Sequence, residues 1–139
     1  MTSNTATALI TGGTSGIGRA TANKLAQLGI HVLVVGRNAE RGEKTVDAIR
    51  AAGGKADFIS ADLQDAASAR TVAKKAIDLG NGHIDILVNN AGIYPFGPTH
   101  EMTEEVSLSR AGFSLMWIAS GFDDPEFERT QGVSPFLIC

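Results

Sequence analysis

The stretch Thr-Gly-Gly-Thr-Ser-Gly-Ile-Gly at residues 11–18 decides how this chain is expected to fold. It follows a short apolar run, Ala6 to Ile10, and it opens a segment with helical spacing. Gly12, Gly16 and Gly18 allow a tight turn, a close approach of phosphate oxygens to the main chain, and close packing of the helix on the strand. The helix N-terminus adds unpaired N–H donors and the positive end of a dipole. The stretch therefore predicts a strand, a phosphate-binding turn and a helix, in that order.

The same alternation continues to about residue 90. Apolar runs predict strands at about 6–11, 31–36, 55–60 and 84–90, and amphipathic segments predict helices at about 16–28 and 39–52 and a third that Asp65 caps and Gly80 ends. Strands that alternate with helices form a parallel sheet covered by helices. With right-handed crossovers and a reversal of winding after the third strand, the fold class is a three-layer α/β/α sandwich with sheet order 3-2-1-4 and a ligand crevice above strands 1 and 4.

The helices are expected to bury one apolar stripe each. In the second helix Val46 and Ile49 turn inward. Glycines at the ends predict where each helix stops, with Gly29 after the first, Gly53 after the second and the Gly80–Gly82 stretch after the third. The stripe of the first helix comprises Ile17, Ala20, Leu25 and Leu28, and that of the third comprises Ala69, Val72, Ala73, Ala76 and Ile77.

Composition narrows the function classes. The chain has 139 residues, 43% of them apolar and 19% charged, which is typical of one soluble globular domain without a membrane span. The N-terminus has no signal-peptide pattern and Cys139 is the only cysteine, so we expect a cytoplasmic protein without an internal disulfide or a cysteine metal cluster. No basic run suggests nucleic acid. Ten of the twelve Lys and Arg lie within residues 1–75, which suits a phosphate-bearing ligand, although scattered solvated charges are the alternative.

Four groups of residues follow the predicted strands, and together they resemble the short-chain dehydrogenase/reductase family. They are residues 11–18, Gly36-Arg37, Asp62-Leu63, and the Asn-Asn-Ala-Gly sequence at 89–92. The glycine spacing and Asn-Asn-Ala-Gly are two hallmarks of that family, and the resemblance covers about residues 6–105. It implies an NAD(P)-binding Rossmann fold and, in a complete member, hydride transfer between the cofactor and a carbonyl or alcohol substrate.

The resemblance also implies which residues hold the cofactor. The turn lies against the pyrophosphate and ribose, Asp62 accepts from the adenine amino group with Leu63 beside it, and the residues after the fourth strand line the adenosine ribose. The implied cofactor-binding residues are Gly12, Thr14, Ser15, Gly16, Ile17, Gly18, Arg37, Asp62, Leu63, Asn90, Ala91 and Gly92. One Asn of the 89–90 pair ties the fourth strand to its neighbours.

The end of the second strand favours NADP over NAD. An NAD-type site has an acid there that bonds the ribose 2′-hydroxyl, whereas this chain has Gly36-Arg37-Asn38. Gly36 leaves room, and Arg37 can form charge-assisted bonds with a 2′-phosphate. The alternative is that Arg37 is only a solvated residue at a helix start.

The catalytic residues that the resemblance requires are missing. The family uses a Tyr as general acid/base and a Lys four residues later, but the only tyrosine is Tyr94, position 98 is proline, and no lysine follows Lys75. We therefore assign no catalytic residue and expect the chain alone to be inactive. Tyr94 is interpreted as a packing or substrate-rim aromatic, and His31, His83 and His100 as surface or strand-end residues. The alternative function is a non-catalytic nucleotide-binding or assembly module.

The pattern divides the chain into residues 1–105, a partial cofactor-binding domain, and residues 106–139, an atypical tail of unassigned structure. Truncation, a frameshift or alternative splicing would each produce such a tail. Without a recognisable fifth strand, the strand at 84–90 is expected to have an open edge that favours self-association. The apolar runs Phe113–Ala119 and Phe136–Cys139 are candidates to cover that edge or to form an intermolecular contact.

Overall fold

The computed structural model describes residues 5–63, 66–90 and 136–138. The order of elements is β1 (Thr7–Thr11), α1 (Gly16–Gln27), β2 (His31–Gly36), α2 (Ala39–Ala51), β3 (Ala56–Ser60), α3 (Ala66–Leu79), β4 (Ile86–Asn89) and β5 (Phe136–Ile138). The predicted alternation of strands and helices up to β4 is confirmed. The bounds differ from the prediction by two residues at most, and Asp65, the predicted cap of α3, lies outside the described residues.

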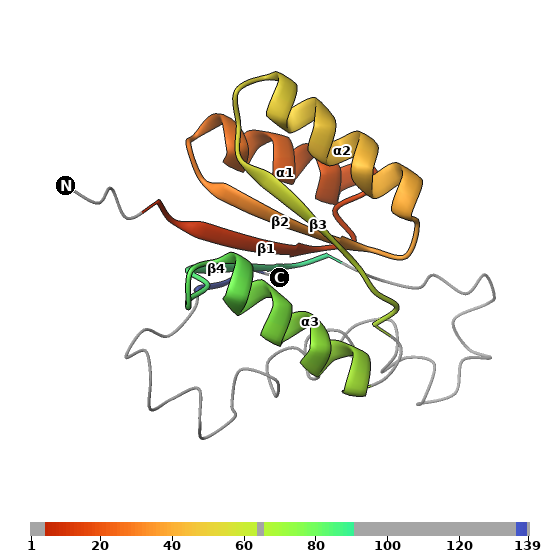
Figure 1. The fold of residues 1–139 in the computed structure, drawn as a ribbon. Coiled ribbons are helices and arrows are strands. Elements are labelled where there is room, and N and C mark those ends of the chain that lie inside the picture. Colours follow the sequence, from red (N-terminus) through yellow and green to blue (C-terminus); the bar gives the residue numbers. More distant parts are fainter. Residues whose placement is uncertain (1–4, 64–65, 91–135, 139) are drawn as a thin grey trace, which may run out of the picture.

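The strands form one parallel sheet in the order β3-β2-β1-β4-β5. The predicted order 3-2-1-4 is confirmed, with a fifth strand added beside β4. Helices α1 and α2 lie on one face of the sheet and α3 lies on the other, which makes three layers (Figure 1). Because all strands run the same way, their carboxyl ends meet at one edge.

The expectation of an open edge at β4 was wrong. Residues 136–138 form β5, which pairs in parallel with β4 so that Ile86 lies opposite Phe136 and Val88 opposite Ile138. Of the two runs proposed to cover this edge, the C-terminal one does so, while residues 113–119 lie outside the described residues. The pattern near β5 could not reveal this, because a three-residue strand has no period of its own and its partner lies about 50 residues earlier.

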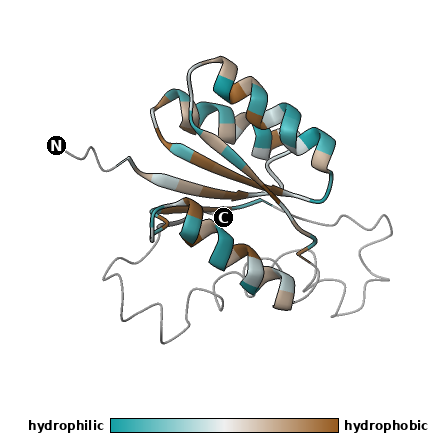
Figure 2. Ribbon diagram, in the orientation of Figure 1, coloured by the Kyte–Doolittle hydropathy of each residue, from teal (hydrophilic) through white to brown (hydrophobic). Residues whose placement is uncertain are grey.

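The core consists of two apolar layers, one on each face of the sheet, and the hydropathy colours show the strands as its most apolar part (Figure 2). On one face, strand residues such as Leu9 and Leu33 pack with Ala69, Val72, Ala73 and Ala76 of α3, and Ile77 is packed against them, so the predicted stripe of α3 is confirmed. On the other face, Val46 and Ile49 of α2 are buried as predicted.

The predicted stripe of α1 was wrong at three of its four positions. Ile17 and Leu28 are 78% and 67% exposed and Ala20 is also exposed, whereas Leu25 is partly buried and packs against the core layer on this face. The buried residues are Gly18, Ala22 and Ala26, which recur every four positions. Small residues on this face let α1 lie close to the sheet, so the helix orients by close approach and not by its largest apolar side chains.

Each helix is followed by a left-handed residue, within the stretch predicted to end it. Gly29, Gly53 and Asn81 adopt the left-handed conformation, with φ of 81°, 87° and 58°. After α1, the amide of Gly29 donates to the Ala26 carbonyl and that of Ile30 to the Leu25 carbonyl. After α2, the amides of Gly53 and Gly54 donate in the same pattern to the carbonyls of Arg50 and Ile49. The ends of α1 and α2 are therefore Schellman motifs, which satisfy the last carbonyls of a helix and turn the chain back toward the next strand.

Candidate functional site

The carboxyl ends of β1, β2, β3 and β4 lie side by side, as the parallel register requires. Thr11 is level with Val35 on one side and Asn89 on the other, and Gly36 is level with Ser60. The segments that follow these residues therefore share one edge of the sheet. Of the predicted site residues, those within 12–18 and Arg37, Asp62, Leu63 and Asn90 meet at this edge, while Ala91 and Gly92 lie outside the described residues.

The turn between β1 and α1 presents main-chain donors. Gly12 and Gly16 have φ of 64° and 53°, values that residues with a Cβ rarely adopt. Ser15 is the N-cap of α1 and is extended, but its side chain makes no capping hydrogen bond. The N–H groups of the first helical turn have no intrahelical acceptor, so at this N-terminus they remain available to an anion.

Gly18 lies at the point where the turn, α1 and β4 come together. A Cβ placed on Gly18 would clash with the carbonyl oxygen of Gly12 and would lie 2.5 Å from Nδ2 of Asn90. That Nδ2 donates to the same Gly12 carbonyl at 3.2 Å. Only a residue without a side chain fits here, because one of the two obstacles is main chain and cannot swing away.

Two residues that the predicted site omitted hold β4 against β1. The Thr11 hydroxyl donates to Oδ1 of Asn89 at 3.3 Å and accepts from the Asn90 amide at 3.0 Å. Both asparagines therefore join the strands, where the resemblance implied one. Nδ2 of Asn89 is buried and finds no acceptor among the described residues. The sequence signal for this link was a polar residue, Thr11 or Asn89, at the end of an apolar strand. Only the register of β1 and β4 shows that the two residues lie opposite each other.

The ends of β2 and β3 contribute residues of different kinds. Arg37 is exposed, and Asn38 caps α2 by accepting from the Arg41 amide at 2.9 Å. Asp62 is exposed, whereas the Leu63 side chain is packed against the core layer beneath α3. Leu63 therefore has a structural role in addition to any backbone contact.

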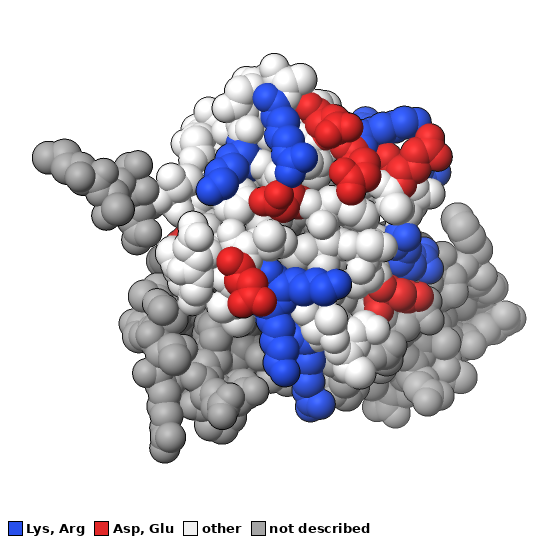
Figure 3. All heavy atoms as spheres, viewed as in Figure 1, with Lys and Arg blue, Asp and Glu red and all other residues white. Residues whose placement is uncertain are grey.

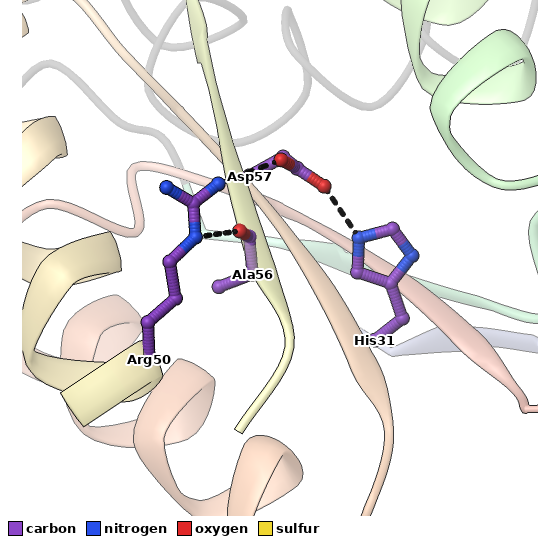
Figure 4. Close-up of polar contacts among 4 residues, drawn as sticks. All are labelled: His31, Arg50, Ala56 and Asp57. Atoms are coloured by element: carbon purple, nitrogen blue, oxygen red, sulfur yellow. Dashed lines mark hydrogen bonds and ion pairs between the residues drawn. The ribbon is translucent and has the colours of Figure 1, made fainter. Parts of the chain in front are cut away.

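The described histidines lie at the opposite edge of the sheet. His31 begins β2, and its ring nitrogen Nε2 is 2.7 Å from Oδ2 of Asp57 on β3, whose Oδ1 accepts from Arg50 at 2.8 Å (Figure 4). His31 is 2% exposed, so it is a strand-end residue as expected but is not on the surface. His83 precedes β4, 3.3 Å from Asp85, and its Nε2 is buried. His100 and Tyr94 lie outside the described residues.

The described charged side chains are not concentrated by sign on the face shown in Figure 3. Lys and Arg are interspersed with Asp and Glu over the face shown in Figure 3. Within the described ranges no group of three or more His, Cys, Asp or Glu could hold a metal ion. None of the described helices is long and apolar enough to cross a membrane.

Comparison with known proteins places this arrangement in a family. The model of the short chain dehydrogenase family matches residues 6–112. An uncharacterized oxidoreductase of Thermotoga maritima is 43% identical over 97 residues, which cover 70% of this chain and 38% of that protein.

Solved structures share both fold and sequence. A short chain dehydrogenase from Burkholderia cenocepacia, in complex with NADP, is 33% identical, with a TM-score of 0.73 over 85% of this chain and 49% of that one. A variant of actinorhodin polyketide ketoreductase, solved with NADPH, is 27% identical, with a TM-score of 0.82 over 99% of this chain and 53% of that one. The chain thus spans about half the length of these two proteins and 38% of the Thermotoga maritima oxidoreductase.

Proposed function

The chain belongs to the short-chain dehydrogenase family, and from this premise we propose that it binds a nicotinamide dinucleotide at the carboxyl edge of its sheet, with NADP(H) preferred to NAD(H). The observation that carries the proposal is the seat of Gly18. Because Gly18 has no Cβ, α1 can begin directly above the Gly12 carbonyl, where a side chain would clash. The first turn of α1 then faces the edge with N–H groups that have no intrahelical acceptor. A pyrophosphate is the group that such a turn accommodates.

Three other predicted residues support the proposal for the rest of such a ligand. Exposed Ile17 offers an apolar surface beside the turn, and Asp62 offers a carboxylate at the end of β3. At the end of β2, Gly36 has no side chain that could repel a phosphate, and the exposed guanidinium of Arg37 follows it. A 2′-phosphate would form charge-assisted hydrogen bonds there. The ligands in the two structures solved with NADP and NADPH support the same preference.

A bound nicotinamide dinucleotide supplies or accepts a hydride, but this chain alone is proposed to be catalytically silent. General acid/base catalysis typically contributes about 10²–10⁴-fold to rate. The chain has one tyrosine, Tyr94, without a lysine four residues later. We therefore expect purified protein to oxidise NADPH no faster than a protein-free control when aldehydes or ketones are added. Substrate-dependent turnover that disappears in Tyr94→Phe would contradict this and would assign the proton to Tyr94.

The absence of that pair also supports a second candidate, a nucleotide-binding or assembly module without activity of its own. The two candidates differ in what completes the site. If another polypeptide supplies the missing acid, turnover should appear on mixing. If the chain is only a module, nucleotide binding should persist without turnover in any mixture.

Calorimetric titration of NADPH tests the binding itself. We expect the wild-type chain to bind NADPH and Gly18→Ala to lose binding, because the new Cβ displaces the turn. Gly54→Ala is a matched control, since its new Cβ would also be crowded, with Cγ2 of Ile49 at 2.8 Å. Gly54 follows the C-terminal end of α2, whereas Arg37 precedes the N-terminal end. Both variants should be less stable, and only the first should lose NADPH. Retained affinity in Gly18→Ala, with circular dichroism like that of the wild type, would place the site elsewhere.

A further inference from the structure

We infer that Thr14 is a specificity-determining residue, because its side chain occupies the space that any side chain at position 36 would need. The inference rests on the proposed binding of a nicotinamide dinucleotide, and it names the residue of the turn that excludes an acid from the end of β2. Thr14 and Gly36 would then form a steric pair that has to change together before the cofactor preference can change.

The contact between the two residues is close. A Cβ built on Gly36 would lie 2.5 Å from Cγ2 of Thr14, 3.2 Å from its Oγ1 and 3.5 Å from its Cβ. The optimal separation of nonbonded carbon atoms is about 3.5–4.0 Å. Removing the atoms beyond the Thr14 Cβ would therefore turn a clash into an ordinary contact. Gly36 is not among the residues with positive φ, so its backbone would accept a side chain if the space were free.

The main chain on both sides of the pair is held in place. The Gly13 amide donates to the Val35 carbonyl at 3.3 Å, and the Gly36 carbonyl accepts from the Ala61 amide at 3.0 Å. The turn also lies close on β2, since a Cβ on Gly13 would be 2.9 Å from Cγ1 of Val34. Thr14 is β-branched and has few accessible rotamers. A shorter residue at position 14 would therefore provide the room at position 36 with the smallest change to the main chain.

Position 36 is the place where the chemistry of the two cofactors differs. It ends β2, about 20 residues after the glycine turn, where an acid bonds the ribose 2′-hydroxyl in NAD-type sites. With Thr14 present, an aspartate there cannot seat its Cβ unless the Thr14 side chain moves or the turn proposed to hold the pyrophosphate shifts. Arg37 then remains the residue at this strand end that can meet the ribose, and it suits a 2′-phosphate.

The steric pair can be tested without any nucleotide. We expect Gly36→Ala to lower the midpoint of thermal unfolding of the wild-type chain. In a chain that already carries Thr14→Ala, the same Gly36→Ala change should lower the midpoint by no more than half as much. Thr14→Ala should not rescue Gly18→Ala, whose obstacles are Gly12 and Asn90. Equal losses from Gly36→Ala with and without Thr14 would overturn the inference.

Nucleotide titrations test the consequence for specificity. Gly36→Asp should weaken NADPH binding without improving NADH binding, because the displaced turn harms both. Adding Thr14→Ala to Gly36→Asp should strengthen NADH binding at least tenfold over the single variant while NADPH stays weak. If Gly36→Asp alone gains NADH affinity as fully as the double variant, the inference is wrong. If the wild-type chain binds neither nucleotide, the proposed function fails. If the chain binds NADPH but Gly36→Ala lowers the unfolding midpoint equally with and without Thr14, only the inference about Thr14 fails.

Discussion

A single guanidinium carries the expected preference for a phosphorylated cofactor. Arg37 is exposed at the end of β2 and follows a residue that has no side chain. We expect Arg37→Ala to weaken NADPH binding by about 1–3 kcal/mol, the typical value of a charge-assisted hydrogen bond, and to leave NADH binding unchanged. Calorimetric titration of both nucleotides measures the difference.

Arg70→Ala is the matched control for that variant. It removes an exposed arginine from α3, on the opposite face of the sheet, so it changes net charge equally without touching the end of β2. If both variants weaken NADPH equally, the effect comes from the overall field of the protein. In that case Arg37 does not contact the phosphate.

The helix ends show how an element depends on the conformation of one residue. Gly29 has a φ of 81° and nothing within 4 Å of the position of a Cβ, so replacing it meets no steric neighbour. We expect Gly29→Ala to lower the free energy of unfolding by about 1–2 kcal/mol, purely from the left-handed backbone. Gln27→Ala, at an exposed helical position two residues earlier, should change it little. Urea unfolding followed by circular dichroism compares them, and equal midpoints would contradict the backbone explanation.

The addition of β5 at the edge of the sheet beside β4 affects the whole molecule. Removing residues 136–139 would leave the backbone groups of β4 unpaired along the edge that β5 covers. We therefore expect this deletion to cause concentration-dependent self-association in sedimentation velocity experiments, which the full chain shows to a smaller degree. Cys139→Ser, measured under reducing conditions, controls for the loss of the thiol. A truncated chain that stays monomeric at every concentration would show that β4 needs no partner strand.

Much of the fold follows from local sequence. The strands up to β4, the three helices and their ends were predictable because each rests on a short period or on a residue such as Gly29 or Gly53 that accepts a left-handed backbone. The glycine turn predicted where α1 would begin. These features depend on interactions within a few residues of the chain, which a single sequence contains.

Contacts between distant residues were decided only by the tertiary structure. The inward face of α1 follows from the fit of Gly18 against Gly12 and Asn90, although Ile17 and Leu28 are the larger apolar residues. The pairing of β5 with β4, the joining of Thr11 to both asparagines and the crowding of Gly36 by Thr14 also link segments far apart in sequence. Periodicity predicts which residues form an element, but packing and register determine which side chains meet, because they depend on the shapes of two surfaces at once.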